Sequence, residues 1–359
     1  MEKLRIGVAG LNRGTSYIRI FNEIEEVEVT AICDVNKEIL DKTGESFGIK
    51  DRYLDYEAML EGGVDIAVIA TPMHTSQAIS ALKSNVHVLS EVPAAFTLDE
   101  CYLLLNAVKK SKAKYMMAEN YCYIKENVLI KNMVHQGLFG DIYFAEGEYV
   151  HDCKSIHHDD RGKPTWRYYW QVGRNGVTYG THSLGPPLEW FNERVVTVSC
   201  LGTGVHTDPE HILEDTVLML CKVESGSLIK IRLDMLSNRP PNVAYYALQG
   251  TKGCYEAPRG LGDAHKVWIM SDSEKYDWKP LKDYEGRYLP EEWMKPPEGA
   301  VKADRDYWLV RDFLDSIIYD TTPPIDIYKA FDFTVPGLIS EDSIRQGGKP
   351  LTVPDFRKM

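Results

Sequence analysis

Residues 3–34, KLRIGVAGLNRGTSYIRIFNEIEEVEVTAICD, set the pattern for the first third of the chain. The apolar run 4–9 ends in a glycine turn at 10–14, and a helical segment and a second apolar run, 27–33, precede Asp34. This order predicts a strand, a phosphate-binding turn, a helix and a second strand. In such a unit, backbone N–H groups at the helix N-terminus bind a pyrophosphate, and an acid after the second strand binds a ribose hydroxyl.

The glycine pattern of this turn is incomplete. Aligned to G-x-G-x-x-G, it presents Gly10, Asn12 and Thr15, so two of the three glycines are absent. Asp34 nevertheless follows at nearly the separation expected for the ribose-binding acid, about 20 residues. We therefore expect Gly10, Asn12 and Asp34 to bind a dinucleotide. Arg13 either reaches the pyrophosphate or is surface charge.

Length and composition indicate a globular protein of two domains. A chain of 359 residues exceeds one ordinary core, and 44% hydrophobic with 26% charged residues is typical of a folded protein. A net charge of −12 without a dense Lys/Arg run argues against a nucleic-acid partner. No apolar stretch approaches the ~20 residues of a membrane span. Seven cysteines without a C-x-x-C pair, and a start without a signal peptide, lead us to expect a reduced, cytoplasmic protein.

Strand-like and helix-like segments alternate as far as residue 120. The runs 64–70, 86–90 and 114–118 are apolar throughout, as buried parallel strands are, and helical segments separate them. We expect a Rossmann domain over 1–120, with a doubly wound parallel sheet whose ligands bind beyond the carboxyl ends of the strands. The remaining candidates for cofactor binding follow these runs: Thr71, Pro72, His74, Glu91 and Pro93.

Beyond residue 120 the pattern becomes richer in strands. Alternating apolar and polar residues in several short segments predict an open, mostly antiparallel sheet. Segment 258–300, rich in Pro, Gly, Trp and charge, is expected to be a long surface excursion, and helices are expected over 301–318 and 326–346. These features predict an α+β domain over 121–359 that serves substrate binding and oligomerisation, so the fold class is α/β with a second α+β domain.

The motifs GVAGLNRG, ICD, AVIATPMH, HVLSEVPAAFTLDEC, GLFGDI and GVTYGTHSLGP resemble the Gfo/Idh/MocA family of nicotinamide-dependent sugar oxidoreductases over nearly the whole chain. Most members carry Glu-Lys-Pro after the fifth strand, and their lysine is tied to catalysis. Here the tripeptide is Glu91-Val92-Pro93. That tripeptide, with AENYCY, NMVHQGLFGDI, YVHD, YGTHSLGP and GTKG, is similar to the narrower glycoside hydrolase family 109, whose members keep NAD bound. Gly180 departs from the proline usual in that branch.

Two residues of YGTHSLGP are the candidates for catalysis. The resemblance implies that this segment is a helix facing the nicotinamide. Oxidation of a sugar carbon needs a base for the hydroxyl proton, and His182 is suited because histidine titrates near neutral pH. Tyr179 lies three residues earlier, so both side chains would share one helical face. Each could instead be a hydrogen-bonded structural residue.

Other polar residues are weaker candidates. Glu119, Tyr121, His151 and Asp152 could bind sugar hydroxyls, although each alone is as often structural. Adjacent His157 and His158 point in different directions in regular backbone and have no third spaced ligand, so we expect a solvated loop and no metal site.

Three functions remain open at this point. The first is an NAD-dependent oxidoreductase, with NADP less favoured because the Asp34 carboxylate would repel a 2′-phosphate. The second is a redox-neutral glycosidase with tightly bound NAD, and the third is a non-catalytic NAD(H)-binding regulator, which the absence of lysine at Val92 keeps open. The expected partner is a small sugar or glycoside, and the resemblance implies a homodimer or homotetramer.

Overall fold

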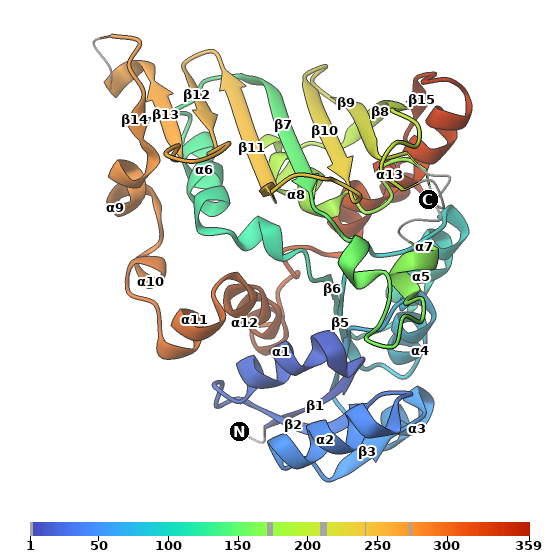
Figure 1. Ribbon diagram of the computed structural model, residues 1–359. Helices are drawn as coiled ribbons and strands as arrows, with labels where there is room; N and C mark the ends of the chain where they lie inside the picture. Colours follow the sequence, from blue (N-terminus) through green and yellow to red (C-terminus); the bar gives the residue numbers. More distant parts are fainter. Residues whose placement is uncertain (1–2, 171–174, 209–213, 241, 273–274) are drawn as a thin grey trace. The chain divides into compact units, whose positions relative to one another are not determined.

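A computed structural model describes residues 3–170, 175–208, 214–240, 242–272 and 275–359 (Figure 1). The chain forms two compact units. Unit 1 comprises Met1–Tyr123 and Pro296–Phe331, and unit 2 comprises Ile124–Lys295 and Asp332–Met359. Unit 1 therefore takes in a segment from the C-terminal half of the chain. The division into domains 1–120 and 121–359 stays a prediction.

Unit 1 is built on a six-stranded parallel sheet. The strand order is β3-β2-β1-β4-β5-β6, which reverses direction between β1 and β4. The parallel pairing and this strand order confirm the predicted doubly wound architecture. In such a sheet, a ligand binds at the point where the order reverses. The strands are β1 Leu4–Ala9, β2 Val27–Cys33, β3 Asp51–Tyr53, β4 Ile66–Ile69, β5 His87–Ser90 and β6 Tyr115–Met117.

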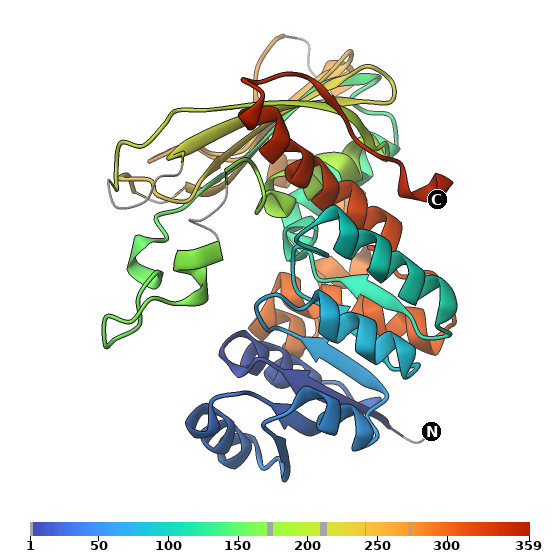
Figure 2. The same ribbon diagram turned by 90° about the vertical axis from the view of Figure 1, so that its right-hand side faces the viewer.

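Helices cover both faces of this sheet, as Figure 2 shows. Helices α1 and α2 contact each other, as do α3 with α4 and α4 with α5, while α12 packs on α1 and α11. Helix α5 has Thr97 as its N-cap, and the Thr97 hydroxyl accepts a hydrogen bond from the Glu100 N–H. The helices are α1 Leu11–Phe21, α2 Lys37–Phe47, α3 Tyr56–Glu61, α4 Thr75–Lys83, α5 Leu98–Lys110, α11 Glu298–Ala303 and α12 Arg305–Ile318, with a 3₁₀ turn η1 at Asn120–Tyr123.

Unit 2 contains a nine-stranded mixed sheet in the order β14-β13-β12-β11-β7-β10-β9-β8-β15. Strands β7 and β10 pair in parallel, and the other neighbours are antiparallel, so the predicted mostly antiparallel sheet is confirmed. The strands are β7 Ile142–Val150, β8 Val195–Gly202, β9 Thr216–Val223, β10 Leu228–Asp234, β11 Asn242–Gly250, β12 Gly253–Glu256, β13 Lys266–Ile269, β14 Lys279–Pro280 and β15 Leu351–Thr352.

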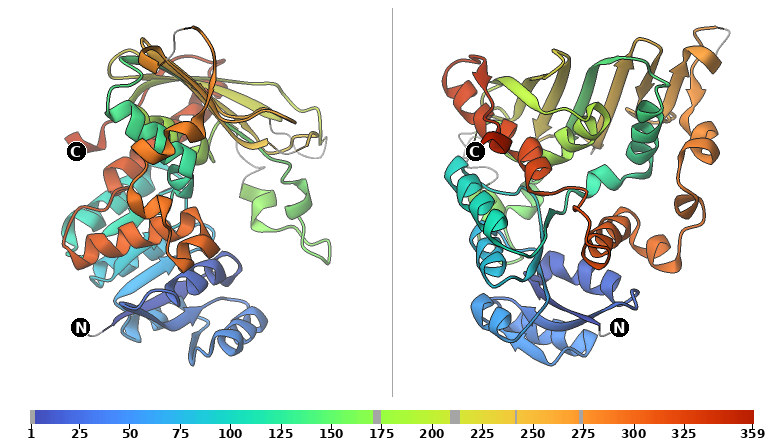
Figure 3. Two further views of the ribbon diagram at one scale, coloured as in Figure 1. Left: turned by 90° about the vertical axis from the view of Figure 1, so that its left-hand side faces the viewer. Right: turned by 180° about the vertical axis from the view of Figure 1, so that it is seen from behind.

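Helices cover one face of this sheet, which Figure 3 shows from behind. Helix α8 contacts β7, β10 and β11, and α6 packs on α8. Residues of β9 alternate between buried and exposed, so the exposed set faces away from α8. The helices that include residues of unit 2 are α6 Lys125–His135, α7 Trp166–Trp170, α8 Thr181–Phe191, α9 Glu285–Tyr288, α10 Glu291–Met294 and α13 Ile327–Arg345.

Segment 258–300 differs from the expected surface excursion. Its residues 266–269 form β13, which pairs with β12, and 279–280 form β14 at the edge of the sheet. Val267 and Ile269 are buried, which gives this short run the alternation of a strand. Within the described residues, no helix is long and apolar enough to cross a membrane.

Candidate functional site

The predicted site residues lie in both compact units. The cofactor candidates with Glu119 and Tyr121 belong to unit 1, and His151, Asp152, Tyr179 and His182 belong to unit 2. The cofactor candidates and the catalytic candidates are therefore held by different sheets.

Gly10 forms the turn between β1 and α1 in a conformation that favours glycine, with φ of 85°. Its N–H donates to the Cys33 carbonyl at 2.9 Å, which ties the turn to the end of β2. A Cβ at this position would lie 2.6 Å from the carbonyl carbon of Ala70 and 2.7 Å from the nitrogen of Thr71. The backbones following β1 and β4 therefore approach each other as closely as glycine allows. The turn also places the N-terminus of α1 at this end of the sheet, where free backbone N–H groups can bind a pyrophosphate.

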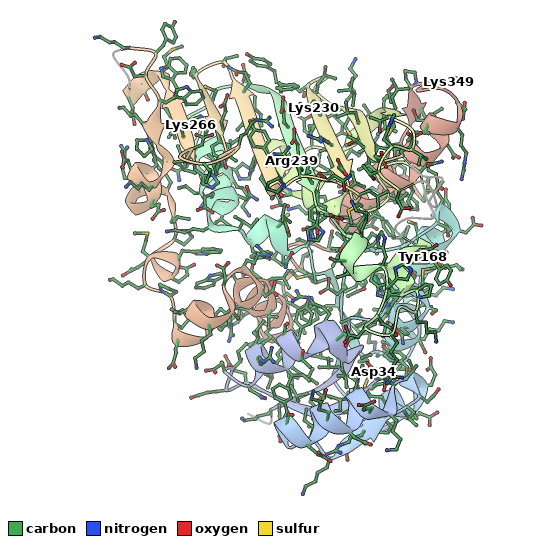
Figure 4. All side chains as sticks on the ribbon, in the orientation of Figure 1. Asp34, Tyr168, Lys230, Arg239, Lys266 and Lys349 are labelled. Carbon is green, nitrogen blue, oxygen red and sulfur yellow. The ribbon has the colours of Figure 1, made fainter. Side chains whose placement is uncertain are left out.

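Asp34 lies directly after β2 and turns its carboxylate toward the glycine turn (Figure 4). One oxygen accepts from the Leu11 N–H and the other from the Asn36 N–H, both at 2.8 Å. Two backbone donors fix the carboxylate at the N-termini of α1 and α2. A carboxylate has about four lone-pair sites, so acceptor capacity remains for the two hydroxyls of a ribose. The turn and the acid thus fit a dinucleotide.

Arg13 lies in the first turn of α1 and is bound to two carboxylates. Its Nε is 2.7 Å from Glu91 Oε1, and its terminal nitrogen is 2.8 Å from Asp306 Oδ2. The Tyr17 hydroxyl donates to the same Glu91 oxygen at 2.8 Å. Burial lowers the pKa of Arg13, but Tyr17, Glu91 and Asp306 together outweigh it, so this pKa lies above its ordinary value. Arg13 is therefore part of an ion network, and its contact with a pyrophosphate stays a prediction.

The next two strands of the sheet, β4 and β5, also end in predicted cofactor-binding residues. Thr71 bonds through its hydroxyl to the Gln77 side chain. His74 is only 2% exposed, with its ring nitrogens near the carbonyl oxygens of Thr71 and Pro93. Val92, where most members of the resembling family carry lysine, is also buried. The predicted cofactor roles of Asn12, Thr71, Pro72, His74, Glu91 and Pro93 stay predictions.

Glu119 and Tyr121 follow β6 and are both buried. Glu119 accepts from the Tyr121 N–H at 3.0 Å, and the Arg305 guanidinium lies 4.8 Å from the centre of the Tyr121 ring. Burial raises the pKa of Tyr121, although Arg305 opposes the shift. Asn120 donates to Asp306 at 2.7 Å, so the start of α12 also joins this end of β6 to the Arg13 network.

In unit 2, His182 and Tyr179 meet at the start of α8. Their rings contact edge to face, with centroids 5.4 Å apart and an interplanar angle of 88°. Only His182 is on the helix: Tyr179 lies in the turn before it, so the expectation that both occupy one helical face is wrong. The turn brings the two rings together instead. The predicted catalytic roles of both residues stay predictions.

Tyr149 completes this cluster and was not among the residues predicted from the sequence. Its ring lies 5.4 Å from His182, 6.0 Å from Tyr179 and 5.8 Å from His151, centroid to centroid. A Cβ at Gly147 would collide with the Ser183 carbonyl, so glycine lets α8 press against β7 two residues before Tyr149. The motif YVHD contained the signal, because Tyr149 lies near the end of an expected strand and two residues before His151, at a spacing that places two side chains on the same side of an extended chain.

His151 and Asp152 are neighbours in the sequence but have different contacts. His151 Nδ1 lies 2.7 Å from the buried Cys153 sulfur, and burial, assisted by Arg167, lowers the pKa of His151. Asp152 turns away from that ring and binds the backbone N–H and the ammonium of Lys154 at 3.0 and 3.1 Å. His151 therefore joins the aromatic cluster through Tyr149, while Asp152 closes a local turn. Their predicted roles in sugar binding stay predictions.

The adjacent histidines 157 and 158 follow a 3₁₀ turn, η2 Lys154–Ile156. The expectation of a solvated loop is wrong for His157, which is buried, with its ring edge to face with Tyr168 at 6.3 Å between centroids. His158 is exposed. Within the described residues, no group of three or more His, Cys, Asp and Glu side chains is arranged to hold a metal ion.

The parallel sheet, the glycine turn and the acid after β2 define an NAD-binding oxidoreductase fold. The model of the oxidoreductase family with an NAD-binding Rossmann fold matches residues 4–119. The model of the glycosyl hydrolase 109 C-terminal domain matches residues 123–198 and 205–359, more than half of the chain. The chain belongs to the glycosyl hydrolase 109 family, and it is an enzyme of the NAD-dependent oxidoreductase type.

Similar proteins agree with this assignment. Glycosyl hydrolase family 109 proteins from Solibacter usitatus and Saccharopolyspora erythraea are each 29% identical, and their alignments cover 99% of this chain and 88% and 84% of theirs. Levoglucosan dehydrogenase in complex with NADH and L-sorbose has the same fold, with a TM-score of 0.83 and 17% identity over 99% of this chain and 100% of that one. Its complex with NADH and levoglucosan gives a TM-score of 0.82 at the same identity and coverage.

Proposed function

We propose that the protein oxidises a ring carbon of a sugar or glycoside with NAD as the hydride acceptor. The observation that carries this proposal is the contact between His182 and Tyr179, two proton-transfer groups with rings 5.4 Å apart. When bound, NAD supplies the hydride chemistry. The protein's own task is then to bind the sugar and to remove the proton of the hydroxyl that becomes a carbonyl.

His182 is the proposed base. A histidine side chain within reach of the substrate hydroxyl can take its proton as the carbonyl forms. Its backbone carbonyl accepts from the Tyr246 hydroxyl, which fixes the start of α8 on β11. Tyr179 donates to or accepts from the same substrate oxygen, and Tyr149 packs against both rings. With Val92 in place of lysine, these residues carry the proton transfer.

Asp34 favours NAD over NADP. Its carboxylate is held by the N–H groups of Leu11 and Asn36, so it cannot easily turn away from the adenosine ribose. A fixed negative charge accepts from the two ribose hydroxyls of NAD and repels the 2′-phosphate of NADP.

A second function, redox-neutral cleavage of glycosides, is favoured by the family match over residues 123–198 and 205–359. Oxidation at carbon 3 acidifies the hydrogen at carbon 2, and its removal by a base expels the aglycone as an alcohol. Water would then add to the double bond, and bound NAD would supply the hydride chemistry that restores the alcohol at carbon 3. The same residues would serve in both functions, but no NADH would accumulate in the second.

One experiment separates these functions. The protein is incubated with NAD and either free sugars or nitrophenyl glycosides, and NADH and nitrophenol are followed by absorbance. NADH from free sugars supports net oxidation, whereas nitrophenol without net NADH supports the glycosidase. If a broad panel yields neither, a non-catalytic NAD(H)-binding regulator becomes the better account.

Variants then test the site itself. His182→Ala should lower the rate by about 10²–10⁴-fold, as removal of a general base does, and Tyr179→Phe should lower it in the same direction. His135→Ala, on α6 of the same unit, is the matched control and should keep the wild-type rate. Full activity of His182→Ala would contradict the assignment.

The open face of the unit 2 sheet is the proposed oligomer interface. Its β8–β10 region exposes Leu201, Leu218, Leu220 and Leu228, with 43–59% of each residue accessible. Contiguous exposed apolar side chains of this kind mark interaction surfaces. On the same face, Lys230 (Figure 4) pairs with Glu146 at 2.9 Å. We propose a homodimer or homotetramer formed through this face. A reducing, cytoplasmic location is proposed from the cysteines, six of which are buried.

A further inference from the structure

His74 is buried at the start of α4, between two loops that follow neighbouring strands. It is 2% exposed, whereas Met73 before it is 51% exposed and has a φ of 55°, in the left-handed region that favours glycine. A methionine in this conformation is strained, and such strain persists only where the surrounding structure imposes it. The backbone thus turns sharply here, with Met73 directed outward and His74 inward.

The His74 ring joins the two loops through their backbones. Nδ1 lies 3.0 Å from the Thr71 carbonyl after β4, and Nε2 lies 2.8 Å from the Pro93 carbonyl after β5. Neutral imidazole donates to one carbonyl, and imidazolium donates to both. Burial lowers the pKa of His74, while the two carbonyls, Glu91 and Glu100 favour the charged form. In either state the ring forms a polar link between the two loops.

Packing and a second polar link reinforce this connection. The Phe96 ring lies edge to face on His74, at 5.2 Å between centroids. Glu100 accepts from the Phe96 N–H at 2.7 Å and from the Thr75 hydroxyl at 3.4 Å. The start of α4 and the loop after β5 are therefore joined twice, by His74 and by Glu100.

The position of these loops in the sheet indicates which half of the cofactor lies next to them. Asp34 after β2 serves the adenosine ribose, and the pyrophosphate belongs at the Gly10 turn after β1. In this fold the two nucleotide halves lie on opposite sides of the point where the strand order reverses. The nicotinamide half must then lie beyond β4 and β5, over the loops that carry Thr71 and Pro93.

We propose that His74 is a positioning residue that holds the loops after β4 and β5 in register to receive the nicotinamide half of the cofactor. The inference rests on the proposed binding of NAD. It gives His74 a supporting role in place of the cofactor contact expected from the sequence, because the residue is 2% exposed and both ring nitrogens lie at loop carbonyls. Replacing His74 should therefore weaken the binding of a ligand that spans both halves of the site. It should not change the affinity for a ligand that fills the adenosine half alone.

The test compares NAD with ADP, which lacks the nicotinamide nucleoside, by calorimetry on the full-length protein freed of copurifying nucleotide. In His74→Phe, loss of one or two hydrogen bonds to the loops should weaken NAD binding roughly tenfold. ADP affinity should stay within about twofold of wild type, since the Gly10 turn and Asp34 are untouched. His74→Gln keeps one donor, so its NAD affinity should fall between those of wild type and His74→Phe.

A matched control uses His87, the first residue of β5 and hence at the opposite end of the strand. His87→Gln should leave the ratio of NAD to ADP affinity unchanged. NAD affinity of His74→Phe equal to wild type, or equal weakening of NAD and ADP, would overturn the inference. If His74→Phe does not fold, His74→Gln decides by the same ratio. Failure of the wild-type protein to bind NAD would overturn the proposed function as well, which separates the two outcomes.

Discussion

Replacing Gly10 with alanine should destabilise the protein and abolish cofactor binding together. Two costs add at this residue. Because Gly10 has φ of 85°, an alanine there would have to adopt the left-handed backbone conformation, which costs about 1–2 kcal/mol. Its Cβ would also lie 2.6 Å from the Ala70 carbonyl carbon, a backbone atom that cannot rotate away. Overpacking of this kind costs about 1–3 kcal/mol, so we expect a loss of about 2–5 kcal/mol in the free energy of unfolding.

The assay is urea denaturation of wild type and variant, followed by NAD titration of the folded proteins. Gly48→Ala is the matched control, because Gly48 has φ of 71° but a Cβ there would have no atom of the described residues within 4 Å. It should show the left-handed penalty alone, about 1–2 kcal/mol, with normal NAD affinity. The reasoning is refuted if Gly10→Ala loses no more stability than Gly48→Ala, or if it binds NAD normally.

Three further predictions concern other parts of the molecule. Asp34→Ser should weaken NAD binding by roughly tenfold and reduce the preference for NAD over NADP, both measured by calorimetry. An unchanged ratio of NAD affinity to NADP affinity would contradict the role proposed for Asp34. The free energy of unfolding should fall as pH drops below about 6.5, because burial, assisted by Lys114, lowers the pKa of His87, whose Nδ1 accepts from the Lys114 N–H at 3.0 Å. The unfolded chain then binds more protons than the folded one, and His87→Gln should reduce this slope in urea denaturation at several pH values. Leu218→Glu should shift sedimentation toward the monomer, whereas an oligomer that withstands this charge would place the interface elsewhere.

The architecture of unit 1 could be predicted because its signals are local. Apolar runs of strand length, separated by helical segments, identify buried parallel strands without knowledge of their neighbours. The Gly10 turn and Asp34 are separated by a single helix, so their meeting follows from the order of elements. The Thr97 cap is equally local, since its hydroxyl binds an N–H three residues later.

Contacts made across long separations could not be predicted. Asp306 binds Arg13 at 2.8 Å, although 292 residues lie between them, and nothing near Asp306 in the sequence marks it as a partner. Strand β13 was not recognised because its short apolar run, Val267 to Met270, lies within a segment rich in Pro, Gly and charge. The partner strand β12 supplies the pairing that makes this short run a strand.

The sequence alone determined the class of this protein: a dinucleotide-binding sheet with Asp34 after its second strand, and the candidates His182 and Tyr179. These depend on residue types at short spacings, which the backbone geometry of strands, turns and helices translates directly into structure. The tertiary structure decided how those candidates are held. Tyr149 joins His182 because Gly147 lets α8 press against β7, and His74 lies between two loops because β4 and β5 are neighbours. Such contacts depend on how separate elements pack, and a linear pattern does not record that packing.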